Sequence, residues 1–84
     1  MREVTHARHL LLPGLFMHAG KDFRFEILES HAGLTIIGSK VGQEHKTVNR
    51  KIRLEDIWDD SYRAKFLPLV NEIKRELGDA PDAG

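Results

Sequence analysis

Three glycine-containing segments restrict the local structure that the middle of the chain can adopt. They lie at residues 19–22, 30–33 and 42–45. Glycine accepts the positive φ angles of tight turns, and the polar residues beside it are also typical of turns. Between the first two segments, Phe23, Phe25 and Ile27 alternate with charged residues, which is the period of a half-buried strand. The spacing therefore predicts a β-meander.

Two more strands are expected after the second turn. Leu34 and Ile36 alternate with a threonine, and Val48, Ile52 and Leu54 fall on one face of a third strand. Residues 33–42 have a composition that disfavours a helix, because β-branched residues lose rotamer freedom in a helix and each glycine costs about 1 kcal/mol relative to alanine. Intrinsic propensity thus favours strands.

The last third of the chain has the periodicity of an amphipathic helix. Its apolar residues recur every three or four positions, as Tyr62, Phe66, Leu69, Val70, Ile73 and Leu77. Residues 59–61 can cap its start, and Gly78 suits a left-handed stop. Pro68 lacks a backbone N–H, so we expect a kink there or a short turn before a helix that begins at Pro68. Residues 79–84 are expected to form a disordered tail.

Length and composition limit the chain to one small domain. It has 84 residues and no cysteine, so it has neither room for a second domain nor thiols for a disulfide framework. We expect one domain over residues 1–78 with an α+β fold, a small antiparallel β-meander or partial barrel followed by the C-terminal helix. No apolar run approaches the roughly 20 residues of a membrane span, so we expect a cytoplasmic protein without membrane contact.

Residues with catalytic or metal-binding potential are scattered along the chain. His6 and His9 could face one side of a short helix, but a metal site needs further ligands at a fixed spacing. The serines have no surrounding nucleophile motif, and no phosphate-binding loop occurs. We therefore expect no enzymatic activity, no metal and no cofactor.

Charge is balanced overall but not along the chain. Residues 1–53 hold nine basic and five acidic side chains, whereas residues 54–84 hold four and eight. The most basic segment carries the residues that we expect to contact nucleic acid: Lys46, Thr47, Asn49, Arg50, Lys51 and Arg53. Such a block next to an acidic segment is consistent with a nucleic-acid-binding face, and equally with two solvated faces that pair with each other.

A repressor-like pattern coincides with the basic segment. In residues 34–53, Gly38 and Gly42 are accompanied by regularly spaced apolar residues, namely Ile37, Val41, Val48 and Ile52. The segment resembles the helix-turn-helix unit of repressor-type regulators. In that family, the position of Gly38 needs a small residue, and the turn position of Gly42 needs a positive φ. The resemblance implies an all-α fold in which a recognition helix enters the major groove of DNA, with Asn49 and Arg50 on base edges.

A second resemblance supports the strands. The residues that carry it are Leu15, Met17, Gly20, Phe23, Ile27, Leu34 and Ile36. Their spacings are similar to the first signature of Sm-like barrels, in which a glycine turn joins two strands. Over residues 15–36 this resemblance implies a small barrel of the Sm-like or SH3-like kind.

Two functions are consistent with these patterns. The first is non-enzymatic nucleic-acid binding by a regulatory protein through residues 45–53, with DNA favoured over RNA. The second is a protein-binding regulator or inhibitor that uses Trp58, Tyr62 and Phe66 together with the C-terminal helix, because an aromatic anchor rimmed by charge is typical of protein interfaces. The apolar face of that helix also favours a homodimer.

Overall fold

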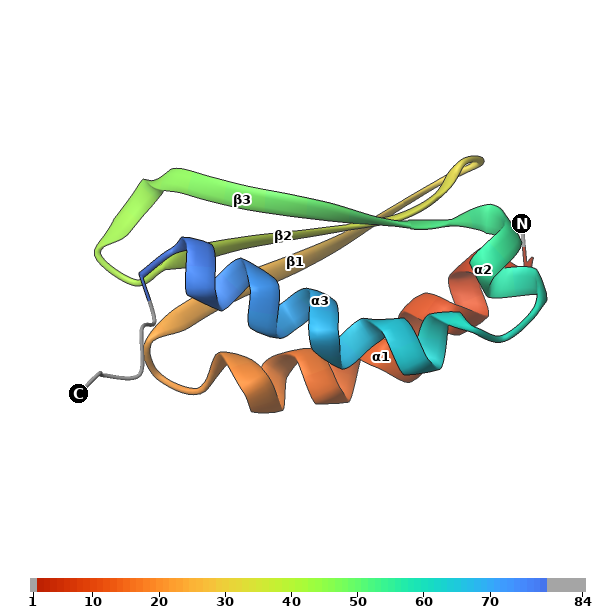
Figure 1. The fold of residues 1–84 in the computed structure, drawn as a ribbon, viewed down its shortest axis with the longest axis horizontal. Coiled ribbons are helices and arrows are strands. Elements are labelled where there is room, and N and C mark those ends of the chain that lie inside the picture. Colours follow the sequence, from red (N-terminus) through yellow and green to blue (C-terminus); the bar gives the residue numbers. More distant parts are fainter. Residues whose placement is uncertain (1, 79–84) are drawn as a thin grey trace.

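The computed structural model describes residues 2–78 as a helix, three strands and two further helices (Figure 1). The elements are α1 (Arg2–Ala19), β1 (Phe23–Ser30), β2 (Gly33–Lys40), β3 (Gln43–Arg53), α2 (Leu54–Trp58) and α3 (Tyr62–Glu76). The predicted α+β class, a meander followed by a C-terminal helix, is confirmed. The tail expected at residues 79–84 lies outside the described residues.

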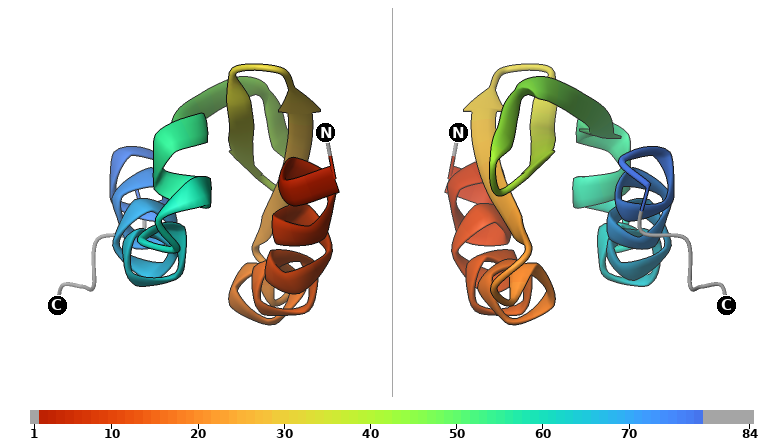
Figure 2. Two further views of the ribbon diagram at one scale, coloured as in Figure 1. Left: turned by 90° about the vertical axis from the view of Figure 1, so that its right-hand side faces the viewer. Right: turned by 90° about the vertical axis from the view of Figure 1, so that its left-hand side faces the viewer.

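The strands form one open antiparallel sheet in the order β1-β2-β3. Helices α1 and α3 lie side by side on the same surface of this sheet (Figure 2). We call the covered surface the inner face and the opposite surface the outer face. Within residues 2–78, no helix combines the length and the apolar character needed to cross a membrane.

The all-α alternative is wrong. Residues 34–53, which resemble a helix-turn-helix unit, lie in β2, β3 and the turn between them. Local composition and tertiary packing agree here, because the β-branched residues of β2 fill a strand that has a partner on each side. Gly42 does take a positive φ of 91°, but it does so in a strand-to-strand turn.

Side chains alternate between the two faces of the sheet. Phe25 of β1 is aligned with Gly38 of β2, which is aligned with Val48 of β3, and these residues face inward. A Cβ atom on Gly38 would meet Ile73 of α3 at 2.5 Å and the Phe25 ring at 2.7 Å. Glycine at this position therefore lets α3 approach the sheet closely.

Helix α1 was only partly expected. Its buried stripe of Val4, Ala7, Leu11 and Leu15 has helical spacing and packs against the sheet. The Sm-like resemblance implied strand structure from Leu15 onward, but the helix continues to Ala19. Pro13 lies within this 18-residue helix and lowers its intrinsic stability. Burial of the apolar stripe compensates for that loss.

Helix α3 begins earlier than Pro68. It starts at Tyr62 and runs to Glu76 through the proline, so the alternative of a helix that begins at Pro68 is wrong. The chain is interrupted between α2 and α3, where Asp60 has a φ of 68°. Its buried residues are Tyr62, Phe66, Val70 and Ile73, as the periodicity predicted. Gly78 follows with a φ of 98°, which is the expected left-handed stop.

Candidate nucleic-acid interface

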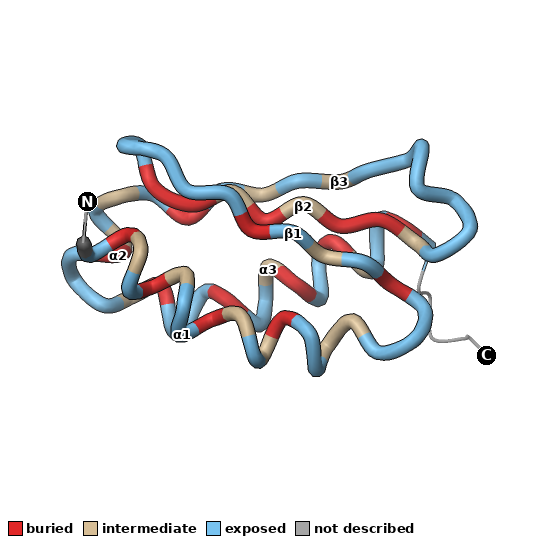
Figure 3. The backbone as a smooth tube through the Cα atoms, turned by 180° about the vertical axis from the view of Figure 1, so that it is seen from behind, coloured by how far each residue is buried: buried red, intermediate tan, exposed pale blue. Residues whose placement is uncertain are grey.

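The outer face of the sheet carries no helix, and most of β3 is exposed (Figure 3). Alternation places Thr47, Asn49, Lys51 and Arg53 on this face, and all of them are exposed. These residues were predicted to contact nucleic acid. The fold brings them together because each is two positions from the next along a single strand.

The neighbouring strand extends this row of polar groups. Thr35 of β2 is aligned with Lys51, and Ile37 of β2 is aligned with Asn49. The alternation of residues in β2 does not by itself indicate that Thr35 or Ile37 belongs to the candidate site. The pairing register supplies that assignment, because it decides which β2 residue lies beside which β3 residue.

Arg50 lies on the other side of the same strand. Its Nε atom is 2.5 Å from a carboxylate oxygen of Glu72, and its guanidinium also contacts Glu76 on the next turn of α3. A further guanidinium nitrogen donates to the Asn49 carbonyl at 2.7 Å. The side chain thus fastens β3 to α3 and does not point out from the face that holds Asn49.

The remaining cations of the segment differ in how far they are neutralised. One nitrogen of Arg53 contacts both carboxylate oxygens of Glu55, at 2.9 and 3.0 Å. In contrast, neither Lys46 nor Lys51 forms an ion pair with an acid of residues 2–78. Lys46 is exposed near the β2–β3 turn. The two lysines are therefore the charges most readily available to an anionic ligand.

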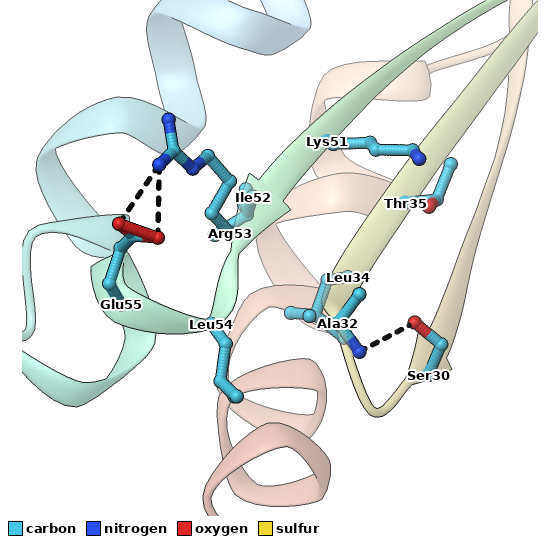
Figure 4. Close-up of a pocket in the computed structure, with 10 residues that line it drawn as sticks. Ser30, Ala32, Leu34, Thr35, Lys51, Ile52, Arg53, Leu54 and Glu55 are labelled. Atoms are coloured by element: carbon cyan, nitrogen blue, oxygen red, sulfur yellow. Dashed lines mark hydrogen bonds and ion pairs between the residues drawn. The ribbon is translucent and has the colours of Figure 1, made fainter.

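A shallow hollow of about 350 Å³ lies at one end of the outer face (Figure 4). Lys51 extends over the sheet toward Thr35, whereas Arg53 turns away toward Glu55. The Ser30 hydroxyl accepts the Ala32 N–H at 3.1 Å on the opposite side of the hollow. An ammonium group beside a hydroxyl is an arrangement that can hold a phosphate oxygen.

The outer face also carries acidic groups. The Arg24 Nε atom lies 3.4 Å from a carboxylate oxygen of Glu44, near the β2–β3 turn. The Gly42 N–H donates to that carboxylate at 3.0 Å. This backbone hydrogen bond is the main cause that lowers the pKa of Glu44, and Arg24 contributes less.

The residues predicted for a protein interface are not brought together on one surface. Trp58, at the end of α2, is 65% exposed. Tyr62 and Phe66 are buried residues of α3 itself, and the Phe66 ring packs edge-on against His18 with ring centroids 6.5 Å apart. Among residues 2–78, no group of three His, Asp or Glu side chains is placed to hold a metal ion.

Comparison with known proteins adds no relative. No protein-family model, no curated protein and no solved structure matches this chain.

Proposed function

We propose that this chain is a non-enzymatic, regulatory nucleic-acid-binding protein that contacts duplex DNA through the outer face of β3. One observation carries the proposal. Lys51 has no acidic partner among residues 2–78 and stands beside Thr47 and Asn49 on a sheet surface that no helix covers. Phosphate contacts by lysine supply affinity, and side-chain amides supply base recognition.

The β3 side of the three-stranded sheet, with β2 beside it, is the part that would enter a DNA groove. The major groove of B-DNA accepts a two-stranded β-ribbon, and an asparagine can bond both major-groove edge atoms of adenine. Asn49 would take this role, with Ile37 beside it against a thymine methyl group. Lys46, Lys51 and Arg53 would contact phosphates. Arg50 would act only by holding β3 on α3.

Duplex DNA is favoured over single-stranded RNA because of the aromatic residues. Proteins that bind single strands stack bases on exposed aromatic rings. The aromatic residues of the three strands are Phe23 and Phe25, and both belong to the inner side of the sheet. Contacts by lysine, threonine and asparagine suit a phosphate backbone and a groove instead.

The test is a salt titration of binding to duplex DNA and to single-stranded RNA. The variant Lys46→Ala/Lys51→Ala should reduce the salt slope of DNA binding by about one per lysine. Lys21→Ala removes an exposed lysine from the α1–β1 turn and serves as the control. Asn49→Ala should relax sequence preference at one base pair by about 1–3 kcal/mol. No binding at low salt, or equal losses with the control, would contradict the proposal.

The exposure of Trp58 supports a second candidate, a protein-binding regulator. A tryptophan left 65% exposed at the end of a short helix can serve as an anchor for a protein partner. Tyr62 and Phe66 would then support the helix from the core rather than contact the partner. Trp58→Ala should leave DNA binding unchanged and abolish a protein interaction, which affinity measurements with each ligand would separate.

A further inference from the structure

The β1 edge of the sheet has unpaired backbone groups. The Asp22 carbonyl accepts the Val41 N–H at 2.9 Å, so even-numbered residues of β1 direct their backbone groups toward β2. The backbone groups of Phe23, Phe25 and Ile27 therefore point away from the sheet, where no strand of residues 2–78 pairs with them. An open row of this kind is a template for another strand.

Helix α1 protects only the second half of this edge. The Arg8 Nε atom donates to the Ile27 carbonyl at 3.2 Å, and the Thr5 hydroxyl donates to the Glu29 carboxylate at 2.7 Å. The first half borders a hollow of about 480 Å³ between β1 and the C-terminal end of α1. Phe16 lines this hollow and is 67% exposed. The first half of the edge is thus both open and apolar.

We propose that two copies of the chain form a homodimer by antiparallel pairing of their β1 strands across a two-fold axis at Phe25. In this register, Phe25 lies opposite Phe25 of the second copy. Arg24 lies opposite Glu26 of the second copy, and symmetry repeats this pair. The two sheets become one, with both α1 helices on the same side. This dimer does not depend on nucleic-acid binding.

Backbone geometry and charge select the same register. Odd-numbered residues must face odd-numbered residues, because only their backbone groups point outward. A two-fold axis at Arg24 or at Glu26 meets this condition but places like charges opposite each other, which is destabilising. An axis at Ile27 pairs no charges and centres the pairing on the carbonyl that Arg8 contacts, whereas an axis at Phe25 uses that carbonyl only at the end of the paired stretch. An axis at Phe23 would place Arg24 opposite Asp22, but Asp22 lies in the turn before β1. Of these five positions, only Phe25 gives two ion pairs between residues of the strand itself.

Apolar surface meets at the same axis. Phe25 is partly exposed and stacks on Phe23, with ring centroids 6.2 Å apart. A second copy would place its own Phe25 against this pair, beside the hollow that Phe16 lines. The β3 edge is a poorer template for self-association, because Lys46 and Lys51 lie along it and form no ion pair with an acid of residues 2–78.

Sedimentation of the full chain tests the proposed dimer. The wild-type chain should dimerise reversibly. Arg24→Glu and Glu26→Arg each turn both ion pairs into like-charge pairs, so each should weaken dimerisation about tenfold or more. Arg63→Glu makes the same charge change at an exposed position on α3 and should leave the dimer intact. Circular dichroism checks that each variant retains its fold.

Two recombined charge patterns sharpen the test. The double variant Arg24→Glu/Glu26→Arg should regain the wild-type affinity. An equimolar mixture of the two single variants should form a heterodimer, because each chain supplies the charges that the other needs. A chain that stays monomeric at the highest concentration it tolerates in solution overturns the proposal. A dimer that neither swap weakens, or that the mixture does not restore, overturns it as well.

Amide hydrogen exchange gives an answer that needs no variant. The N–H groups of Phe23 and Phe25 point outward in the monomer and would be hydrogen-bonded in the dimer. Their exchange should be slow in concentrated wild-type protein and should accelerate on dilution. Fast exchange at every concentration contradicts the pairing even if a charge-swapped variant fails to fold.

Discussion

The two faces of β3 carry different kinds of residue although they belong to the same eleven-residue strand. On the inner face, Ile52 is buried and Arg50 is tied to two carboxylates of α3. On the outer face, Asn49 and Lys51 are exposed, and Lys51 has no acidic partner within residues 2–78. A block of cations that looks uniform in the sequence is thus divided by strand alternation into a structural half and an available half.

The chemistry of the two cations suits this division. The guanidinium of Arg50 is planar and has several donors, so it can contact Glu72 and Glu76 together with a backbone carbonyl. The ammonium of Lys51 is a compact charge on a flexible side chain, which suits reversible contact with a phosphate group. Arg50 therefore suits a structural role, and Lys51, the next residue, suits contact with a ligand.

The largest contrast is expected between neighbours in sequence. Ile52→Ala should destabilise the chain by about 2–5 kcal/mol, because it removes buried methyl groups and leaves a cavity beside Leu34. Lys51→Ala should change stability by no more than about 0.5 kcal/mol, since it alters only the surface. Urea denaturation of both variants measures the difference. Similar losses would mean that the strand does not alternate as described.

A second effect concerns the close approach of α3 to the inner face. Gly38→Ala should cost about 1–3 kcal/mol, because the new methyl group would collide with Ile73 and Phe25. Adding Ile73→Leu removes the β-branch nearest to the new methyl group and should recover part of the loss. Thermal unfolding of the single and double variants checks this coupling, and strictly additive losses would contradict it.

A smaller effect is expected at Arg50. Arg50→Ala should reduce stability by about 0.5–2 kcal/mol, because two partly exposed ion pairs are lost. Glu72→Gln/Glu76→Gln should cause a similar loss through the same contacts. DNA affinity should fall less with Arg50→Ala than with Lys51→Ala when both chains are folded. The reverse order would place Arg50 in the interface and contradict its structural role.

The smallest effect belongs to an outer-face carboxylate. The Gly42 N–H lowers the pKa of Glu44 in the folded chain, so this carboxylate favours folding above the ordinary glutamate pKa of about 4.3. That contribution should be lost as the pH falls through the lowered pKa. Glu44→Gln should therefore reduce the pH dependence of stability in acid and leave it unchanged near neutrality. Parallel stability curves for the two chains from neutral to acid pH would exclude this contribution.

Local sequence predicted much of the meander and the last helix. The observed turns at residues 20–22, 31–32 and 41–42 lie at or next to the predicted segments, although residues 43–45 belong to β3. Gly78 follows α3 with the expected positive φ. Each of these features depends on backbone preferences within a few residues. Such preferences act before any distant part of the chain is in place.

Helix α1 could not be placed from local preferences alone. Pro13 and Gly14 weaken the helix signal, and the spacing from Leu15 to Phe23 also suits two strands and a turn. The helix is stabilised by the burial of Val4 and Leu11 in the hydrophobic core. That core exists only after the strands have paired.

The candidate site shows the same limit in its electrostatics. The sequence identified the basic segment, and alternation placed Asn49 and Lys51 on one side of it. Alternation also placed Arg50 on the opposite side, but the sequence did not identify its acidic partners, because Glu72 and Glu76 lie more than twenty residues further along the chain. Ion pairing between distant elements follows from packing and not from local pattern.

By itself, the amino-acid sequence determined where the chain turns, which segments alternate, and that a cationic block precedes an acidic one. Only the tertiary structure decided which side of β3 is covered, which of its cations keep an available charge, and which sheet edge remains open. Turns and alternation are set by neighbouring residues through φ, ψ and the two-residue period of a strand. Coverage and pairing are set by the three-dimensional approach of α1 and α3, which no local segment encodes.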